Sequence, residues 1–353
     1  MADPTDWTPD HVVAHAQRAV ALELFTIPAY LCAYWSIIQG RSPAAADAAE
    51  RLRGVVNQEM LHLELVCNLS SALGRPPALT SAAPSYPGRV PYNQHDIEVV
   101  LGPATPAQIR AFMTLELPVW LEPYTLTDLP PQDRYETIGD FYHALIHGIQ
   151  AVYGSDGTSA SAPWPGGAGA QVYGNFRDDD FPIADAASAV KAIELVVLQG
   201  EGASKTDPHD DDPGELAHYY QLQKILGELG SGDVRPMVSA TAALGYSTRC
   251  ARLLDFFDAC YSDLLSRLEA SFQGRAAVGP AVGLMWASLN ALGVYVVDAP
   301  YQPADDAPET GSTLTPRFRF TTTTPADAYA ALDPADHDAA AVAGVAAAMG
   351  IGR

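Results

Sequence analysis

The sequence predicts an all-α protein, in which a helical bundle is followed by additional helices and a C-terminal appendage rich in proline and threonine. Apolar residues at positions 13, 16, 20, 24 and 27 recur at the spacing of one helix face, and similar patterns dominate the first two thirds of the chain. Glycine and proline mark the ends of several of these patterns. Hydrophobic residues make up 48% of the 353 residues, which is enough for a sizeable core.

The two longest helical patterns come first and form a predicted antiparallel hairpin. The first pattern covers residues 10–39, with Asp10 in position to cap its N-terminus. Pro28 lies inside this pattern and should bend the helix, because proline has no amide hydrogen to donate to the preceding turn. The second pattern covers residues 43–73 and stops at Gly74.

Further helices are predicted for most of the remaining chain. Short ones follow over residues 107–117 and 134–153, then helices over 184–201 and 213–229, and two more long ones over 247–272 and 276–293. The proline-rich residues 75–105 are predicted to form an ordered loop over the bundle, and residues 154–180 a loop or mobile lid. The PRFRFTTTT segment resembles an extended strand. We therefore divide the chain into a bundle (residues 1–230), additional helices packed on it (231–298) and an extended appendage (299–353).

Composition excludes several classes of function. The net charge is -22 and the pI is about 4.5, which argues against nucleic acid and anionic membranes, because both require basic side chains. The four cysteines form no CxxC pair, so a thiolate zinc site is not expected. The charge-free run from Ala276 to Val297 is long enough to span a membrane, but glycine, proline and polar residues interrupt it. We interpret it as buried core and expect a soluble cytoplasmic protein.

The first candidate for chemistry is the pair Glu59 and His62. On a helix these positions project from one face, so a carboxylate and an imidazole can bind one metal ion together. The Glu-x-x-His spacing alone often arises as a surface pair. Here it lies in VVNQEMLHLELVCNLSSAL, where apolar residues surround it and a buried charged pair would need compensation.

Glu23 is the natural partner of this pair, because it lies in the most apolar part of the first predicted helix. Glu23 is about 18 residues before the turn of the hairpin and Glu59 about 17 residues after it, which places them at nearly the same height. The sequence therefore predicts that these two carboxylates converge.

A second half-site should come from the later helices. The candidates are Glu194 and Glu201 on one predicted helix, Glu215 and His218 on the next, and Glu116 and Asp140 in earlier apolar segments. Counted from the loop between these two helices, Glu201 lies at nearly the same height as Glu215 or His218, so it is expected to pair with one of them. Glu215 could equally be a carboxylate at a helix N-terminus, and Glu116 and Asp140 could equally be buried hydrogen-bonded groups. The acidic runs 178–180 and 210–212 are expected to be solvated loops.

The ordered segments LELFTIPAYL, NQEMLHLELVCNLSSALG, TLELP, TIGDFYHAL, LQGEGAS and LAHYYQLQKI resemble the ferritin-like domain of the iminophenyl-pyruvate dimer synthase type. Such domains occur in large proteins that couple two oxidised amino-acid imines in violacein and indolocarbazole pathways. The resemblance covers roughly residues 12–228 and implies a ferritin-like bundle with non-haem iron. It implies as ligands Glu23, Glu59, His62, Glu201 and His218, with Glu116 and Asp140 as less specific matches.

The resemblance implies a non-haem iron oxidase or oxygenase of secondary metabolism, with two iron ions, or manganese in their place. Its partners would be a small molecule, such as an aromatic amino-acid derivative, and dioxygen or peroxide, and the chain could form a homo-oligomer. Imine dimerisation itself is not carried over, because the pathway enzymes are much longer chains. The alternative is a metal-binding or structural bundle without redox catalysis.

Overall fold

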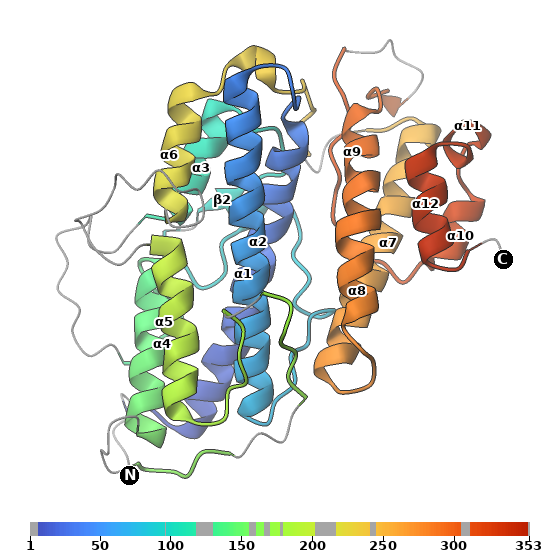
Figure 1. Cartoon of the computed structure of the whole chain (residues 1–353). Coiled ribbons are helices and arrows are strands. Elements are labelled where there is room, and N and C mark those ends of the chain that lie inside the picture. The colour runs from blue at the N-terminus through green and yellow to red at the C-terminus, as the bar shows by residue number, and fades with distance from the viewer. Residues whose placement is uncertain are drawn as a thin grey trace.

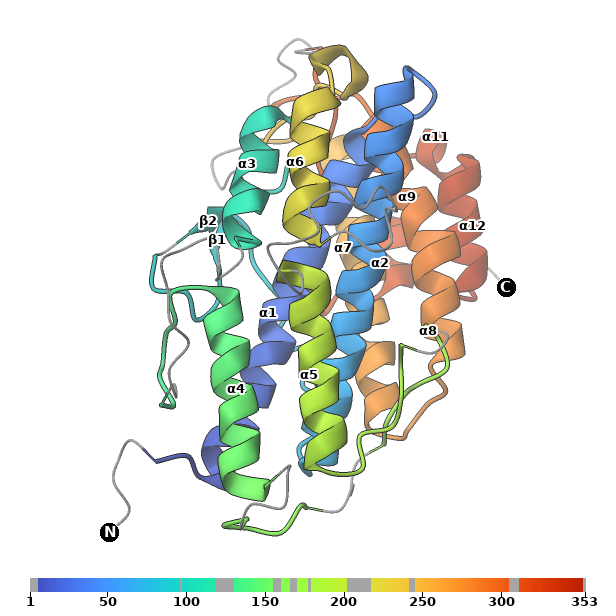
Figure 2. The same cartoon turned by 60° about the vertical axis from the view of Figure 1, so that its left-hand side comes forward.

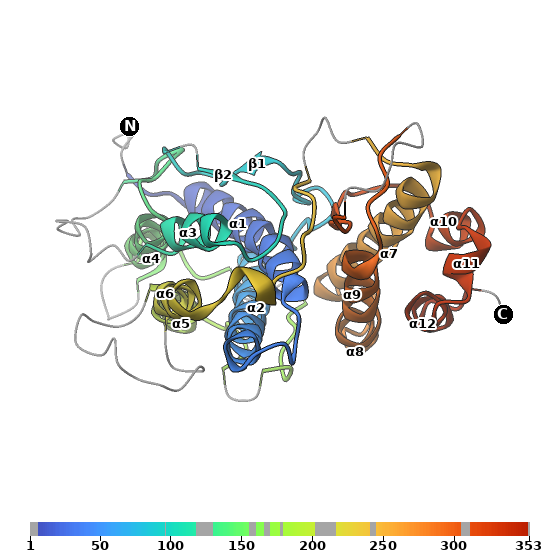
Figure 3. The same cartoon turned by 90° about the horizontal axis from the view of Figure 1, so that it is seen from above.

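The computed structural model describes residues 6–95, 97–117, 130–154, 160–165, 170–176, 179–201, 217–240, 245–304 and 311–351, except for the side chain of Glu201. These residues are mostly helical, as the sequence predicts. Figures 1 and 3 show two neighbouring groups of helices, one formed by the first two thirds of the chain and the other by its last third.

Two long helices, α1 (Pro9–Ser36) and α2 (Pro43–Ala72), form the predicted hairpin at the centre of the bundle. Thr8, and not Asp10, caps α1: its hydroxyl accepts a hydrogen bond from the amide of His11 at 3.3 Å. Pro9 occupies the first helical position, where its fixed φ angle favours the helix. The helix therefore begins at Pro9, with Thr8 as its N-cap. The helix α1 continues without interruption through the buried Pro28.

The other two positions of the bundle are each occupied by two shorter helices. One position holds α3 (Pro106–Leu115) and α4 (Ile138–Tyr153), and the other holds α5 (Ala186–Glu201) and α6 (His218–Glu228). In Figure 2, α3 and α6 lie above α4 and α5, beside the long pair α1 and α2. Four helix ends therefore meet near the middle of the bundle, at the level of the candidate site described below.

The proline-rich segment between α2 and α3 contains a short antiparallel hairpin of β1 (Gly88–Arg89) and β2 (Glu98–Val99). The segment lies against α1, because the Tyr86 hydroxyl donates a hydrogen bond to the carbonyl of Phe25 and the two rings pack together. The predicted ordered loop over the bundle is thus confirmed among the described residues.

The last third of the chain forms the second group of helices. After η2 (Ser231–Asp233) come α7 (Thr248–Phe272) and one continuous helical stretch made of α8 (Gly279–Gly283), the π-helical η3 (Leu284–Leu289) and α9 (Asn290–Asp298). Three short helices complete it: α10 (Pro325–Ala330), α11 (Pro334–His337) and α12 (Ala340–Ala348).

The appendage predicted as extended is therefore helical from Pro325 onward. Thr324 and Asp333 cap α10 and α11 ahead of a proline, and alanine-rich segments favour helix. The buried Asp336 ties the appendage to α7 through an ion pair with Arg249 at 2.9 Å and to α9 through the Tyr295 hydroxyl at 2.8 Å. The predicted strand is wrong: the structure assigns no strand to residues 316–324.

Close contact between α1 and α9 joins the two groups of helices. A Cβ atom at Gly293 would lie 2.5 Å from the indole ring of Trp35, so only glycine permits this approach. The indole nitrogen of Trp35 donates to Asn290 Oδ1 at 2.6 Å. Arg235 adds a bridge, because its guanidinium binds the carbonyl of Ile37 at 2.8 Å and Asp298 at 2.5 Å.

Two helices are long and apolar enough to span a bilayer when judged by length and composition alone, Pro9–Ser36 and Gly279–Asp298. In the first, 89% of the most apolar window is buried inside the protein, as in the core helix of a soluble bundle. In the second, the buried share is 44%. The run predicted as buried core is thus buried only in part, and the half-buried Met285 and Trp286 face a cavity.

Candidate metal centre

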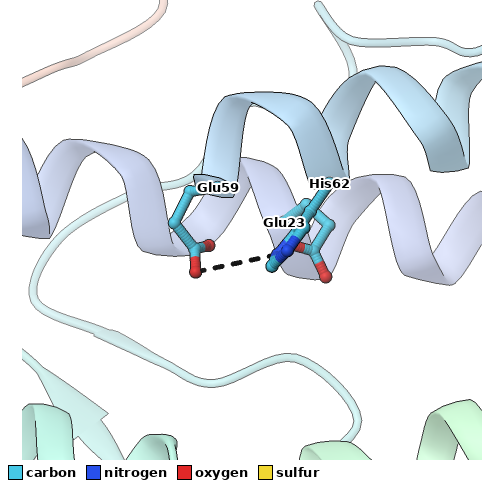
Figure 4. A group of neighbouring side chains, drawn as sticks. All are labelled: Glu23, Glu59 and His62. Atoms are coloured by element: carbon cyan, nitrogen blue, oxygen red, sulfur yellow. Dashed lines mark ion pairs between the residues drawn. The ribbon is translucent and has the colours of Figure 1, made fainter. Parts of the chain in front are cut away.

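Five buried side chains with metal-ligating chemistry converge where the four helix ends meet. They are Glu23 on α1, Glu59 and His62 on α2, Glu116 at the C-terminal end of α3, and His218 at the first position of α6. Their exposures lie between 0% and 7%. Figure 4 shows Glu59 and His62 projecting from α2 toward Glu23 on the neighbouring α1.

The first group of possible ligands contains Glu23, Glu59 and His62. One ligating atom from each lies within 4.8 Å of the others. His62 Nδ1 is 3.6 Å from Glu23 Oε2 and 4.0 Å from Glu59 Oε1. The structure thus brings together the carboxylates whose equal depth in the hairpin the sequence predicted.

The second group contains Glu59, Glu116 and His218, again with ligating atoms within 4.8 Å of one another. His218 Nδ1 is 3.0 Å from Glu59 Oε1 and 3.6 Å from Glu116 Oε2. Glu59 belongs to both groups, and its Oε1 faces both imidazoles. This arrangement places one carboxylate between two neighbouring sets of ligands.

Both imidazoles are oriented by glutamine side chains. His62 Nε2 lies 3.0 Å from Gln199 Oε1, and His218 Nε2 lies 3.1 Å from Gln58 Oε1. An amide oxygen can only accept, so each Nε2 carries the proton and Nδ1 is left as the donor atom for a metal. His218 Nδ1 is buried and faces the carboxylate oxygens of Glu59 and Glu116.

Each of the three carboxylates uses one oxygen for a hydrogen bond within the protein. Tyr142 donates to Glu23 Oε1, Thr26 to Glu59 Oε2 and Tyr30 to Glu116 Oε1. The other oxygen of each carboxylate is the one that faces a histidine. Burial raises the pKa of both tyrosines well above its usual value, so these phenols stay neutral donors. This pattern fixes the carboxylates and leaves one oxygen of each for a cation.

The charges of the five side chains partly compensate one another. Burial raises the pKa of Glu23. Burial opposes the ionisation of Glu59 too, but the hydrogen bond and charge of His218 hold its pKa below the usual value. For His218, burial favours the neutral form, yet hydrogen bonds and charge from Glu116 and Glu59 raise its pKa to about 10. Without a metal, His218 is thus an imidazolium between two carboxylates, and a metal ion would take the place of its proton.

The space at the centre matches small occupants. A cavity of about 30 Å³ is lined by the side chains of Glu23, Thr26, Glu59, His62, Glu116 and Tyr142, together with apolar residues of α4 and α5. One water molecule needs roughly 10–15 Å³ by this measure, so the cavity has room for about two ions or water-sized groups. The set of carboxylates and imidazoles suits iron or manganese better than copper or a thiolate-bound metal. The residues present therefore fit a metal ion, and two groups could each hold one.

The remaining predicted ligands lie elsewhere or outside the described residues. Asp140 does not join the cluster: it forms a capping box with Thr137 at the start of α4, with its Oδ2 accepting from the Thr137 amide at 3.2 Å. The N-terminal turn of a helix favours such a carboxylate, which explains its burial. Glu194 is exposed on α5. The Glu201 side chain and Glu215 lie outside the described residues.

Sequence reasoning missed the residues that hold the ligands in place. Thr26 lies one helical turn after Glu23, and Gln58 directly precedes Glu59. The positions of both residues in the sequence could therefore have indicated that they lie near the ligands. Tyr142 and Gln199 come from helices whose contacts with α1 and α2 no local pattern reveals.

Comparison with known proteins places this geometry in a family. A family model described as ferritin-like matches residues 16–227, which is more than half of the chain. No curated protein matches the chain. The crystal structure of a ferritin-like protein from Caulobacter vibrioides is similar, with 25% sequence identity, a TM-score of 0.65, and coverage of 82% of this chain and 96% of that chain. The family model begins inside α1, ends in the last turn of α6 and includes every residue of the centre, but it ends before the second group of helices. On this evidence the chain belongs to the ferritin-like family.

Proposed function

We propose that the protein binds two iron ions at this centre and uses them to oxidise a small molecule with dioxygen or peroxide. The observation that carries the proposal is the position of Glu59, which belongs to two overlapping groups of carboxylate and histidine ligands. A shared carboxylate between two such groups is the arrangement expected of a two-metal site. Manganese is the alternative metal, because it prefers the same ligands.

The residues of the chain would hold and shield the metals. Bound iron would supply the electrons that reduce the oxidant. The three carboxylates offset the charge of the ions, and the two glutamines keep each His Nδ1 turned toward them. Tyr30 and Tyr142 hold the carboxylates by donating hydrogen bonds. The apolar residues around the centre exclude bulk water.

The cavity volume bears on the substrate. About 30 Å³ admits a diatomic oxidant but is smaller than an aromatic ring. An aromatic amino-acid derivative, the substrate class that the family resemblance favours, would therefore need the helix ends of α4 and α5 to move apart. We expect the reaction to belong to secondary metabolism in the cytoplasm, where the four buried cysteines would stay reduced.

One specific observation favours a second candidate, a structural bundle without metal. The imidazolium of His218 lies between Glu59 and Glu116 and already offsets one of their two negative charges. A buried polar cluster of this kind could serve the fold alone. Metal content separates the two functions.

The test is to load the metal-free protein with Fe(II) under anaerobic conditions, remove excess iron, and then add dioxygen. We expect about two iron ions per chain and rapid dioxygen uptake linked to iron oxidation. The Glu59→Gln variant should lose both, whereas Glu50→Gln, an exposed carboxylate on the same helix, should lose neither. Iron binding without any faster oxidation than that of free Fe(II) would refute the redox function and leave metal binding intact.

A further inference from the structure

A second cavity lies between the bundle and the C-terminal helices. It has a volume of about 110 Å³, which approaches the size of cavities that accept a single aromatic ring. One wall is formed by α1 and α2, through residues such as Leu24 and Met60. The opposite wall is formed by α7 and the α8–η3 stretch, through residues such as Leu265, Met285 and Trp286.

This cavity is separate from the metal centre. The two cavities share no lining residue within the described part of the chain. Leu24 and Met60 directly follow Glu23 and Glu59, and successive helix residues point about 100° apart. The long helices α1 and α2 thus present ligating carboxylates on one face and this apolar wall on another.

Two buried polar atoms in the wall have no partner that satisfies them. Glu64 is 7% exposed, and its Oε1 accepts no hydrogen bond from any described donor. Its Oε2 accepts from the side-chain amide of Asn175 at 2.8 Å, which fixes the carboxyl group in place. Tyr261 is 4% exposed, and its hydroxyl has no hydrogen-bond partner among the described residues. Buried polar atoms are normally paired, so these two indicate a missing partner.

A second acidic group, Asp180, lies beside Glu64 behind the lining residues Asn175 and Phe176. Asp180 is 8% exposed, although the sequence predicts a solvated acidic run there. Its Oδ2 accepts from the backbone amides of Asn175 at 2.6 Å and Phe176 at 3.0 Å, and these bonds explain its burial. The carboxyl groups of Asp180 and Glu64 lie within hydrogen-bonding reach of each other, and Asp180 Oδ1 has no donor among the described residues either. Burial and this acidic neighbour raise the pKa of Glu64 to about 8, so the ligand-free pair holds a proton that an ammonium group would displace. The polar end of the cavity is therefore acidic.

The lining selects the chemistry of an occupant. No lysine, arginine or histidine lines the cavity within the described residues, so a carboxylate or phosphate ligand would find no opposite charge. A pure hydrocarbon would fill the apolar part and leave Glu64 and Tyr261 unpaired. A ligand with an apolar body of about one ring and a single ammonium group would fill the space and donate to Glu64.

From this geometry we infer a binding site for a small apolar primary amine between α1–α2 and α7–η3, with Glu64 as the acceptor for its ammonium group and Tyr261 as a second polar contact. The site lies outside the metal centre and is independent of the proposed redox function.

The experiment is a calorimetric titration of the full chain, treated with a chelator, with 2-phenylethylamine. Phenylacetic acid and ethylbenzene serve as matched ligands that differ only in the head group. We expect saturable binding of the amine with one site per chain, and much weaker binding of the other two. Use of the metal-free protein separates this result from the proposed function, because loss of the metal centre would leave amine binding unchanged.

Three variants test the assignment. Glu64→Gln keeps the shape of the side chain and should weaken amine binding about tenfold or more, and Tyr261→Phe about fivefold. Val282→Phe should abolish binding by filling the cavity from α8, even if a change at the buried Glu64 disturbs folding. Glu50→Gln, exposed on α2, should bind as the natural protein does.

Several results would overturn the inference. These are the absence of saturable binding up to about 10 mM amine, equal affinity for the acid or the hydrocarbon, or amine affinity in a folded Glu64→Gln variant within about twofold of the natural protein.

Discussion

Replacing the three carboxylates of the metal centre one at a time should change the number of bound ions in a pattern that only a shared Glu59 explains. Glu59 belongs to both groups of ligands, Glu23 to the first and Glu116 to the second. Glu59→Gln leaves each group with one carboxylate and one histidine, whereas Glu23→Gln and Glu116→Gln each leave the other group complete. We therefore expect a fall from about two ions per chain to nearly none in Glu59→Gln, and to about one in each of the other variants.

The assay is elemental analysis after iron loading and gel filtration, with protein quantified by amino-acid analysis. Glutamine keeps the carbonyl oxygen that accepts from Thr26, so the fold should survive the change at Glu59. Glu50→Gln controls for loss of one negative charge on α2. If Glu59→Gln retained as much iron as Glu23→Gln, the two groups would not share a carboxylate and the reasoning would fail.

Two further predictions concern stability. The pKa of His218 is raised from 6.5 to about 10, so its contribution to the metal-free protein is full below about pH 6.5 and is lost as the pH rises through about 10. Urea unfolding of chelator-treated protein should show a steeper loss of stability over this range than a His218→Gln variant, and parallel curves would contradict the assignment. Gly293→Ala should destabilise the protein by about 1–3 kcal/mol, because the new Cβ would lie 2.5 Å from the Trp35 ring. Gly283→Ala on α8, where the Cβ meets nothing within 4 Å, should be neutral or stabilising; equal effects in thermal unfolding would argue against the close contact.

Much of the first half of the centre is predictable from the sequence because it depends on local geometry. Glu59 and His62 share a face by helical spacing, and the short turn between the first two helices sets Glu23 at the depth of Glu59. Both relations follow from the rise per residue alone.

The second half is harder to predict because it depends on how separate helices pack. Glu116 is the C-cap of α3 and His218 begins α6, and no periodic pattern fixes where two such helix ends meet. The structural role of Asp140 was predictable from the sequence, because Thr137 lies three residues before it and this spacing is typical of a capping box. The proline after Thr324 was a helix-start signal in the same way, and it marks the first helix of the C-terminal appendage.

The second cavity was not predictable from the sequence. It is formed by α1 and α2 on one side and by α7 and η3 on the other, and these elements are about 200 residues apart in the chain. Glu64 lies on the same helix as Glu59, and only the fold shows that it lines the second cavity and not the metal centre.

The most direct test of the central claim is anomalous diffraction at the iron edge from crystals of the iron-loaded protein. The account predicts two iron peaks, one contacting Glu23, Glu59 and His62 and the other contacting Glu59, Glu116 and His218. Crystals from fully loaded protein with no iron peak beside Glu59, or with iron bound only to other residues, would contradict it.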